Sequence, residues 1–137
     1  DLVAAKQHGI PVTNCEGENH ITVAEHVFAL ILSFLKNICL EYNVTKAGRW
    51  ERLVGHEIFG KTIGIIGLGR IGKEVAIRSK AFGLHVLAND LMIDEKFVKE
   101  HEIEVIKTKE EIFEKFFNDL EYYEQLVDFI CSAQGIK

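Results

Sequence analysis

The residues with the clearest chemical potential in this 137-residue chain are three glycines, Gly67, Gly69 and Gly72, spaced as Gly-x-Gly-x-x-Gly. The apolar run Thr62–Ile66 precedes them and predicts a buried strand, and the amphipathic stretch from Arg70 to Phe82 predicts a helix. In such a strand–turn–helix, the glycines allow a sharp turn, close approach of a pyrophosphate, and close packing of the helix on the strand. The pattern therefore predicts a dinucleotide-binding turn with the anion at the helix N-terminus.

An acidic residue follows this turn close to the distance that such a fold requires. Gly83 predicts the end of the helix, and Leu84 to Asp90 reads as a second strand that ends in a carboxylate. Dinucleotide-binding folds place an Asp or Glu about 20 residues beyond the turn, as the acceptor for the adenosine ribose hydroxyls. A structural turn followed by a surface Asp would give the same residues, but the context on both sides favours nucleotide binding.

Composition restricts the class of protein. A net charge of −5 with no basic run argues against nucleic-acid binding, and 47% hydrophobic with 27% charged residues is ordinary for one soluble domain. Cys15, Cys39 and Cys131 show no paired spacing, and no signal peptide is visible, so we expect reduced thiols and a cytoplasmic location. The chain begins without Met, as expected of a fragment or a processed piece.

The N-terminal part predicts three helices and one short strand. The residues from Asp1 to His8 read as the end of a helix that Gly9 stops, and Ile10–Asn14 reads as a short strand. A second helix over Ile21–Leu35 is apolar almost all round, and a third is expected over Glu41–Arg52, with Trp50 as a packing residue.

The helix Ile21–Leu35 needs more burial than a small surface helix, because it is apolar on nearly every side. Its polar interruptions leave too short an uncharged run to cross a membrane. We expect it to form part of a subunit interface, the alternative being burial within its own domain. His20 and His26 fall on different sides of a helix, so no metal site is predicted.

Beyond Asp90, two further elements are expected before the pattern becomes ambiguous. Asp94 is predicted to cap a short helix through His101, and Glu104–Ile106 reads as a third strand. Thr108 and Glu111 form a capping box that begins another helix. Residues 116–131 read either as the continuation of that helix or as a loop followed by a strand.

With these residues in place, the chain resembles the D-isomer-specific 2-hydroxyacid dehydrogenases, a family that includes phosphoglycerate dehydrogenase and a corepressor branch. The resemblance rests on an ordered set of segments: Gly9-Ile-Pro-Val-Thr-Asn14, Val23-Ala-Glu-His26, Gly48-Arg-Trp50, Gly60-Lys-Thr62, Gly67-Leu-Gly-Arg-Ile-Gly72 and Lys80-Ala-Phe-Gly83. The NAD-binding domain of adenosylhomocysteinase has a similar plan, but Gly48-Arg-Trp50 and Gly60-Lys-Thr62 fit it less well.

The resemblance implies an α/β fold, a Rossmann-type parallel sheet with flanking helices whose second half is incomplete. Residues 1–20 would be the tail of a neighbouring substrate domain, and residues 21–137 a partial NAD-binding domain. Within the latter, residues 21–52 would be interface helices of a homodimer, 61–115 a βαβαβα core, and 116–137 a divergent tail.

The resemblance also implies the site residues. Gly67, Gly69 and Gly72 would form the NAD turn, Arg70 and Ile71 would contact the pyrophosphate, and Asp90 would bind the adenosine ribose. No arginine follows Asp90, which favours NAD over NADP.

The catalytic residues of the family are not found in this chain. Family enzymes use an arginine to hold the substrate carboxylate and a histidine paired with an acid, but the last arginine here is Arg78 and the one histidine after Asp90 is His101. No catalytic residue is therefore assigned, and the isolated chain is expected not to turn over substrate. The substrate itself is not indicated. A non-catalytic, NAD-responsive dimerisation or corepressor-type module is the alternative function.

Overall fold

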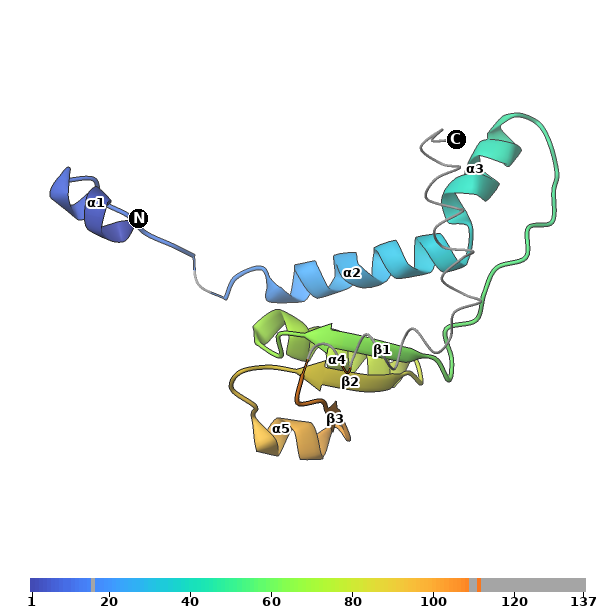
Figure 1. The fold of residues 1–137 in the computed structure, drawn as a ribbon. Helices are drawn as coiled ribbons and strands as arrows, with labels where there is room; N and C mark the ends of the chain where they lie inside the picture. Colours follow the sequence, from blue (N-terminus) through green and yellow to red (C-terminus); the bar gives the residue numbers. More distant parts are fainter. Residues whose placement is uncertain (16, 109–110, 112–137) are drawn as a thin grey trace.

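The computed structural model describes residues 1–15, 17–108 and 111. Its elements in chain order are α1 (Leu2–Gln7), α2 (His20–Leu35), α3 (Ile38–Lys46), β1 (Thr62–Ile66), α4 (Arg70–Ala81), β2 (His85–Asn89), α5 (Glu95–Glu100) and β3 (Glu104–Val105). Figure 1 shows them along the chain. The two alternatives for residues 116–131, and the divergent tail at 116–137, lie outside the described residues.

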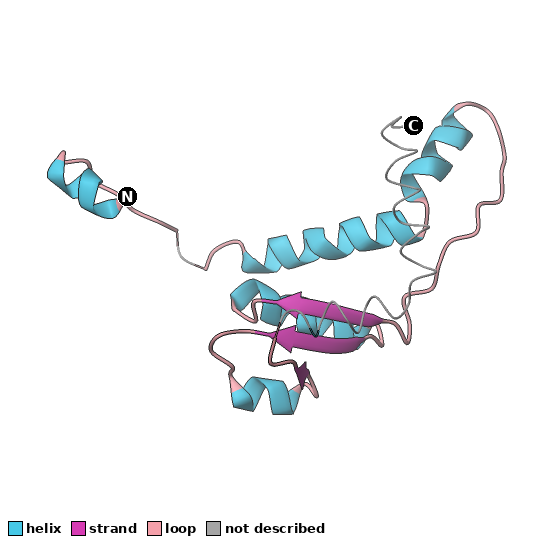
Figure 2. Ribbon diagram, viewed as in Figure 1, coloured by secondary structure: helices cyan, strands magenta, loops and turns pink. Residues whose placement is uncertain are grey.

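The strands form a parallel sheet in the order β1-β2-β3 (Figure 2). Ile65 pairs with Ala88 between the first two strands, and Leu87 pairs with Glu104 between the second and the third. Parallel neighbours need a crossover connection, and α4 and α5 provide the two crossovers. The predicted α/β class, with a parallel sheet and flanking helices, is confirmed.

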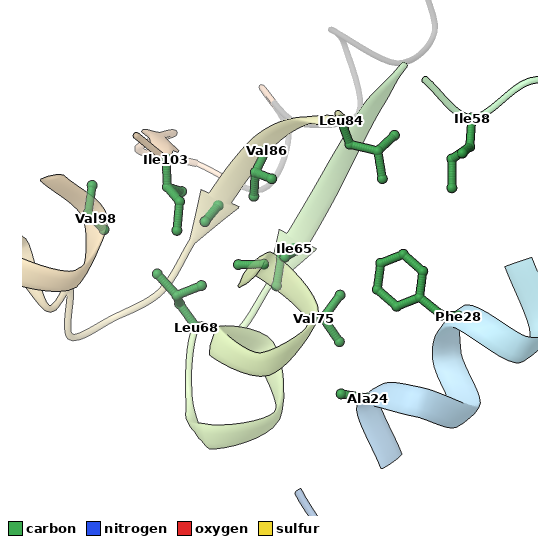
Figure 3. Packing of buried hydrophobic residues seen from close by; sticks show 12 residues of the cluster. Ala24, Phe28, Ile58, Ile65, Leu68, Val75, Leu84, Val86, Val98 and Ile103 are labelled. Atoms are coloured by element: carbon green, nitrogen blue, oxygen red, sulfur yellow. The ribbon is translucent and has the colours of Figure 1, made fainter. Parts of the chain in front are cut away.

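The core lies on the side of the sheet that carries α4 and α5. Side chains from both helices, including Val75 and Val98, join Ile65 and Val86 from the strands in one buried cluster (Figure 3). Because both crossover helices contribute to the same cluster, they cover the same face of the sheet. Each fully buried aliphatic side chain stabilises such a core by about 1.5–3 kcal/mol.

Helix α2 packs on the outside of α4 and is buried along one side only. Ala24 and Phe28 are buried in the same core, and the Phe28 ring stacks on that of Phe82 with 5.1 Å between centroids. Leu30 lies on the opposite side and is 59% exposed, and Ile21, in the first turn of the helix on the side of Ala24, is also exposed. In the part of the chain that the structure describes, no single helix is long and apolar enough to cross a membrane. Helices α2 and α3 are long and apolar enough only when taken together, and they are bent by 60° where they join.

The connection from α3 to β1 is long, and residues 49–58 form neither helix nor strand. Two hydrogen bonds fasten its second half to the corner between α2 and α3: the His56 N–H donates to the Leu35 carbonyl at 2.7 Å, and the Asn37 side chain donates to the Val54 carbonyl at 3.0 Å. Ile58 is buried in the core where the connection reaches β1.

Two expectations for the N-terminal part were wrong. Ile10–Asn14 is not a strand; Ile10 and Val12 are exposed, and the described residues offer no neighbouring strand for it. The third helix begins at Ile38 and ends at Lys46, and does not continue to Arg52. Trp50 therefore lies beyond the helix and is 92% exposed, so it is not a packing residue in this structure.

Gly48 explains the early end of α3. It adopts φ of +72°, in the left-handed region that glycine tolerates best. The N–H groups of Gly48 and Arg49 donate to the carbonyls of Thr45 and Val44, which is the Schellman arrangement that ends helices. Gly83 ends α4 with the same arrangement, as predicted, at φ of +74°.

Candidate nucleotide-binding site

The glycine turn begins where β1 ends, and it is fastened to the end of β2. Gly67 has φ of +97°, a conformation that a residue with a side chain rarely adopts. Its N–H donates to the Asn89 carbonyl at 2.8 Å. The turn therefore lies at the carboxyl edge of the sheet, which is where ligands bind in open α/β folds.

Gly72 lets the first turn of α4 pack against the glycine turn. A Cβ at Gly72 would lie 2.1 Å from the Gly67 carbonyl oxygen and 3.3 Å from Cγ2 of Ile65. Any side chain at this position would push the helix away from both. Glycine is thus required here by the packing of the chain itself.

Gly69 is different, because the described residues leave the position of its Cβ open to 4 Å. It is the N-cap of α4, with extended backbone and no side chain to satisfy the helix N–H groups. The first N–H groups of a helix have no intrahelical partner, and its N-terminus carries a partial positive charge. This end of α4 can accept an anion at close range.

Asp90 follows β2 directly, and its carboxylate lies beside the glycine turn. Its Oδ1 accepts the N–H of Met92 at 2.9 Å, and its Oδ2 accepts the N–H of Leu68 at 2.5 Å. These backbone hydrogen bonds, Met92 first and then Leu68, lower the pKa of Asp90. The carboxylate is therefore charged at neutral pH, and it has further lone pairs with which to accept hydroxyl donors.

Asn89 is a residue that our sequence analysis missed. Its side-chain Nδ2 donates to the carbonyls of Ile106 at 2.8 Å and Lys107 at 3.1 Å, so it holds the end of β3 beside that of β2. The amide places Asp90 by fixing the residue before it. No local signal separates this Asn from an ordinary polar residue at the end of a strand, since both carbonyls are distant in sequence.

Arg70 and Ile71 open α4 next to the glycine turn. Ile71 is exposed, and the Arg70 guanidinium lies against Gly17, in the turn before α2. Lys73, one turn further along, has its Nζ 2.5 Å from Oδ2 of Asp94 and 5.0 Å from the centre of the Phe97 ring. Lys73 therefore joins α4 to α5, and its hydrogen bond is the main cause of a lowered pKa at Asp94.

The structure thus brings all six predicted residues, Gly67, Gly69, Arg70, Ile71, Gly72 and Asp90, to one edge of the sheet. Elsewhere in the described ranges, few side chains are arranged for metal binding or catalysis. No group of His, Cys, Asp or Glu among residues 1–15, 17–108 and 111 is arranged to hold a metal ion. His101 lies at the end of α5 with its ring 4.4 Å from that of Phe97.

Comparison with known proteins agrees with this geometry. The family model for the D-isomer specific 2-hydroxyacid dehydrogenase NAD-binding domain matches residues 28–116. The D-3-phosphoglycerate dehydrogenase of Bacillus subtilis is 40% identical over 116 residues, which are 83% of this chain and 22% of that protein. That of Archaeoglobus fulgidus is 46% identical over 98 residues, 70% of this chain and 19% of the relative.

Solved structures show the same likeness. The apo structure of D-lactate dehydrogenase from Escherichia coli superposes with a TM-score of 0.70 at 31% identity, over 78% of this chain and 34% of that one. The Aquifex aeolicus D-lactate dehydrogenase, complexed with NAD and lactic acid, gives 0.65 at 33% identity over 80% and 33%. The chain spans about a fifth of the length of the curated relatives cited above. It belongs to the D-isomer specific 2-hydroxyacid dehydrogenase family, through that family's NAD-binding domain.

Proposed function

We propose that this chain is the NAD-binding part of an oxidoreductase that transfers a hydride between NAD and a D-2-hydroxy acid. The observation that carries the proposal is the joint placement of Asp90 and the glycine turn. The hydrogen bond from Leu68 to Asp90 ties the end of β2 to the glycine turn, which supports a role for Asp90 as ribose acceptor beside a phosphate-binding helix end. Family membership supplies the reaction class.

Each predicted residue has a defined part in this proposal. Asp90 accepts hydrogen bonds from the adenosine ribose hydroxyls, and the start of α4 receives the pyrophosphate. Arg70 adds a positive charge, and Ile71 adds apolar surface and a backbone N–H. Bound NAD would supply or accept the hydride, while these residues bind and orient it.

The same geometry favours NAD over NADP. Asp90 is held in its charged form by two backbone hydrogen bonds, and a carboxylate at that position repels a 2′-phosphate. No arginine follows Asp90 in the chain, so the usual partner for that phosphate is lacking.

Turnover would need groups that the 137 residues do not provide. The last arginine, Arg78, donates from Nη1 to Oε2 of Glu74 at 2.5 Å within α4. His101 is packed against Phe97. Neither side chain lies at the carboxyl edge of the sheet, where a nicotinamide would be reached. We therefore propose that the isolated chain binds NAD but does not reduce a 2-keto acid.

We further propose that α2, through the segment Ile21–Leu35, forms a homodimer interface. The helix is apolar nearly all round, yet Ile21 and Leu30 stay exposed on different sides of it, and a helix of this composition is usually buried more completely. A cytoplasmic location stays a prediction from the cysteine content.

Calorimetric titration of the chain with NADH and NADPH tests the proposal. Binding of NADH with weak or no binding of NADPH is expected, and a preference for NADPH would contradict the role of Asp90. A parallel assay with NADH and pyruvate or hydroxypyruvate should show no oxidation of NADH. Measurable turnover would overturn the proposal that this chain alone is inactive. Binding of NADH that changes only the oligomeric state would favour the regulatory alternative.

A further inference from the structure

A contact between two segments far apart in sequence lies at the edge of the proposed site. Nη1 of Arg70, the first residue of α4, lies 2.7 Å from the position that a Cβ would take at Gly17, and its Cζ lies 3.5 Å away. Gly17 belongs to the turn before α2. In Figure 1 the start of α2 lies at the same end of the sheet as the arrowheads of β1 and β2.

This turn is held in place from the side of α2. Gly17 has φ of +84°, and the ring Nδ1 of His20 lies 2.5 Å from its carbonyl oxygen, so Nδ1 carries the proton that it donates. His20 is the first residue of α2, which is fixed to the core through Ala24 and Phe28. Gly17 is therefore tied to the packed helix α2, and its backbone is a neighbour against which the Arg70 side chain can be positioned.

We infer that Gly17 is a positioning residue for Arg70, and that its lack of a side chain lets the guanidinium rest where it can reach a bound pyrophosphate. This inference rests on the proposed binding of NAD. The atom that a Cβ would displace belongs to the far end of a long, flexible side chain. Displacing it costs little folding free energy but misplaces the charge.

The effect of a substitution at Gly17 should therefore appear mainly in binding. Charge-assisted hydrogen bonds to phosphate depend strongly on the geometry of the guanidinium. Gly17→Ala is expected to weaken binding of NADH to nearly the same extent as Arg70→Ala, about tenfold for the loss of one such contact.

Gly48 offers a matched control. It also has a positive φ, +72°, but nothing lies within 4 Å of its Cβ position among the described residues. Gly48→Ala therefore introduces the same backbone strain without displacing a cation. The melting temperatures of the Gly17→Ala and Gly48→Ala variants should fall by similar amounts.

A double-mutant cycle on the full 137-residue chain tests the inference, with affinity for NADH measured by calorimetry. Gly17→Ala should weaken binding in the wild-type background, have no further effect in the Arg70→Ala background, and differ from Gly48→Ala, which should bind as the wild type does. Equal weakening by Gly17→Ala in both backgrounds, or unchanged affinity in the wild-type background, would overturn the positioning role. Failure of the wild-type chain to bind NADH would instead refute the proposed function, and this inference with it.

Discussion

The Asp90 carboxylate accepts the N–H of Leu68 at 2.5 Å, and this bond joins the end of β2 to the turn after β1. In the sequence, helix α4 and strand β2 lie between the two residues that this hydrogen bond joins. The bond therefore makes the side chain proposed to bind ribose a structural part of the turn proposed to bind phosphate, so changes at Asp90 affect both.

Replacing Asp90 with Ala should weaken NADH binding about tenfold or more, because both the ribose acceptor and the anchor of the turn are lost. Asp90→Asn keeps an acceptor oxygen but loses the charge, so it should bind NADH better than Asp90→Ala does and discriminate less against NADPH. Titration calorimetry of the three proteins measures this. Equal affinity of the wild-type and Asp90→Ala chains for NADH would contradict the assignment.

Gly72 and Gly69 should respond differently to Ala. At Gly72 the new Cβ would meet the Gly67 carbonyl oxygen at 2.1 Å, so overpacking should destabilise the fold by about 1–3 kcal/mol. At Gly69 the position is open, so stability should change little while a methyl group obstructs the approach of the pyrophosphate. Urea denaturation and NADH titration separate the two effects. A Gly69→Ala variant that binds NADH normally would argue against close phosphate approach there.

Acid should destabilise the chain through Asp90 and Asp94. The pKa of each carboxyl is lowered below its ordinary value of 3.8 in the folded protein, by backbone hydrogen bonds at Asp90 and by Lys73 at Asp94. The folded state therefore binds fewer protons than the unfolded state, so stability is present above about pH 4 and falls as the pH drops through the folded pKa values. Urea midpoints from pH 6 down to pH 2.5 measure this, and Asp94→Asn should flatten the curve. Urea midpoints that rise on acidification would contradict the predicted loss of stability.

Phe28 should contribute strongly to stability, because its buried ring joins α2 to the core and stacks on Phe82. Phe28→Ala is expected to lower the free energy of unfolding by about 3–5 kcal/mol. Trp50→Ala, at an exposed position, serves as the control and should stay within about 0.5 kcal/mol of wild type. Similar losses in the two variants would show that α2 is not packed as described.

Leu30→Asp should convert the proposed dimer to a monomer, because it places a charge at an exposed apolar position of α2. Light scattering at micromolar concentration gives the subunit number, and Val54→Asp, another exposed apolar position outside the helices, is the control. A wild-type chain that is already monomeric under these conditions would refute the interface.

The elements that sequence analysis predicted well are those whose signals are local. The run from Thr62 to Ile66, the glycine spacing and the stop at Gly83 all lie within one strand–helix–strand unit, and β1 has the predicted bounds. Asp94 caps α5 through the N–H of Phe97, and the Glu111 N–H donates to the Thr108 hydroxyl at 3.2 Å, as the capping patterns predicted.

The features that sequence analysis missed depend on contacts between distant segments. Asn89 bonds to the carbonyls of Ile106 and Lys107, which follow β3. Arg70, at the start of α4, contacts Gly17 in the turn before α2. Ile10–Asn14 has strand-like residues but no neighbouring strand among those described, and pairing decides whether such residues form a strand. Gly48 itself is a local signal for the end of a helix, but the apolar pattern around it led to a predicted helix that continues to Arg52.

The long connection between α3 and β1 is a place where the backbone can be cleaved while the packing of the core is kept. Residues 49–53 precede the hydrogen bonds that hold Val54 and His56, so cleavage there cuts neither a helix nor a strand. Ala24 and Phe28 would still hold the N-terminal piece in the core. The nicked protein should therefore behave as two fragments that remain associated, and separately made fragments should reconstitute the fold on mixing.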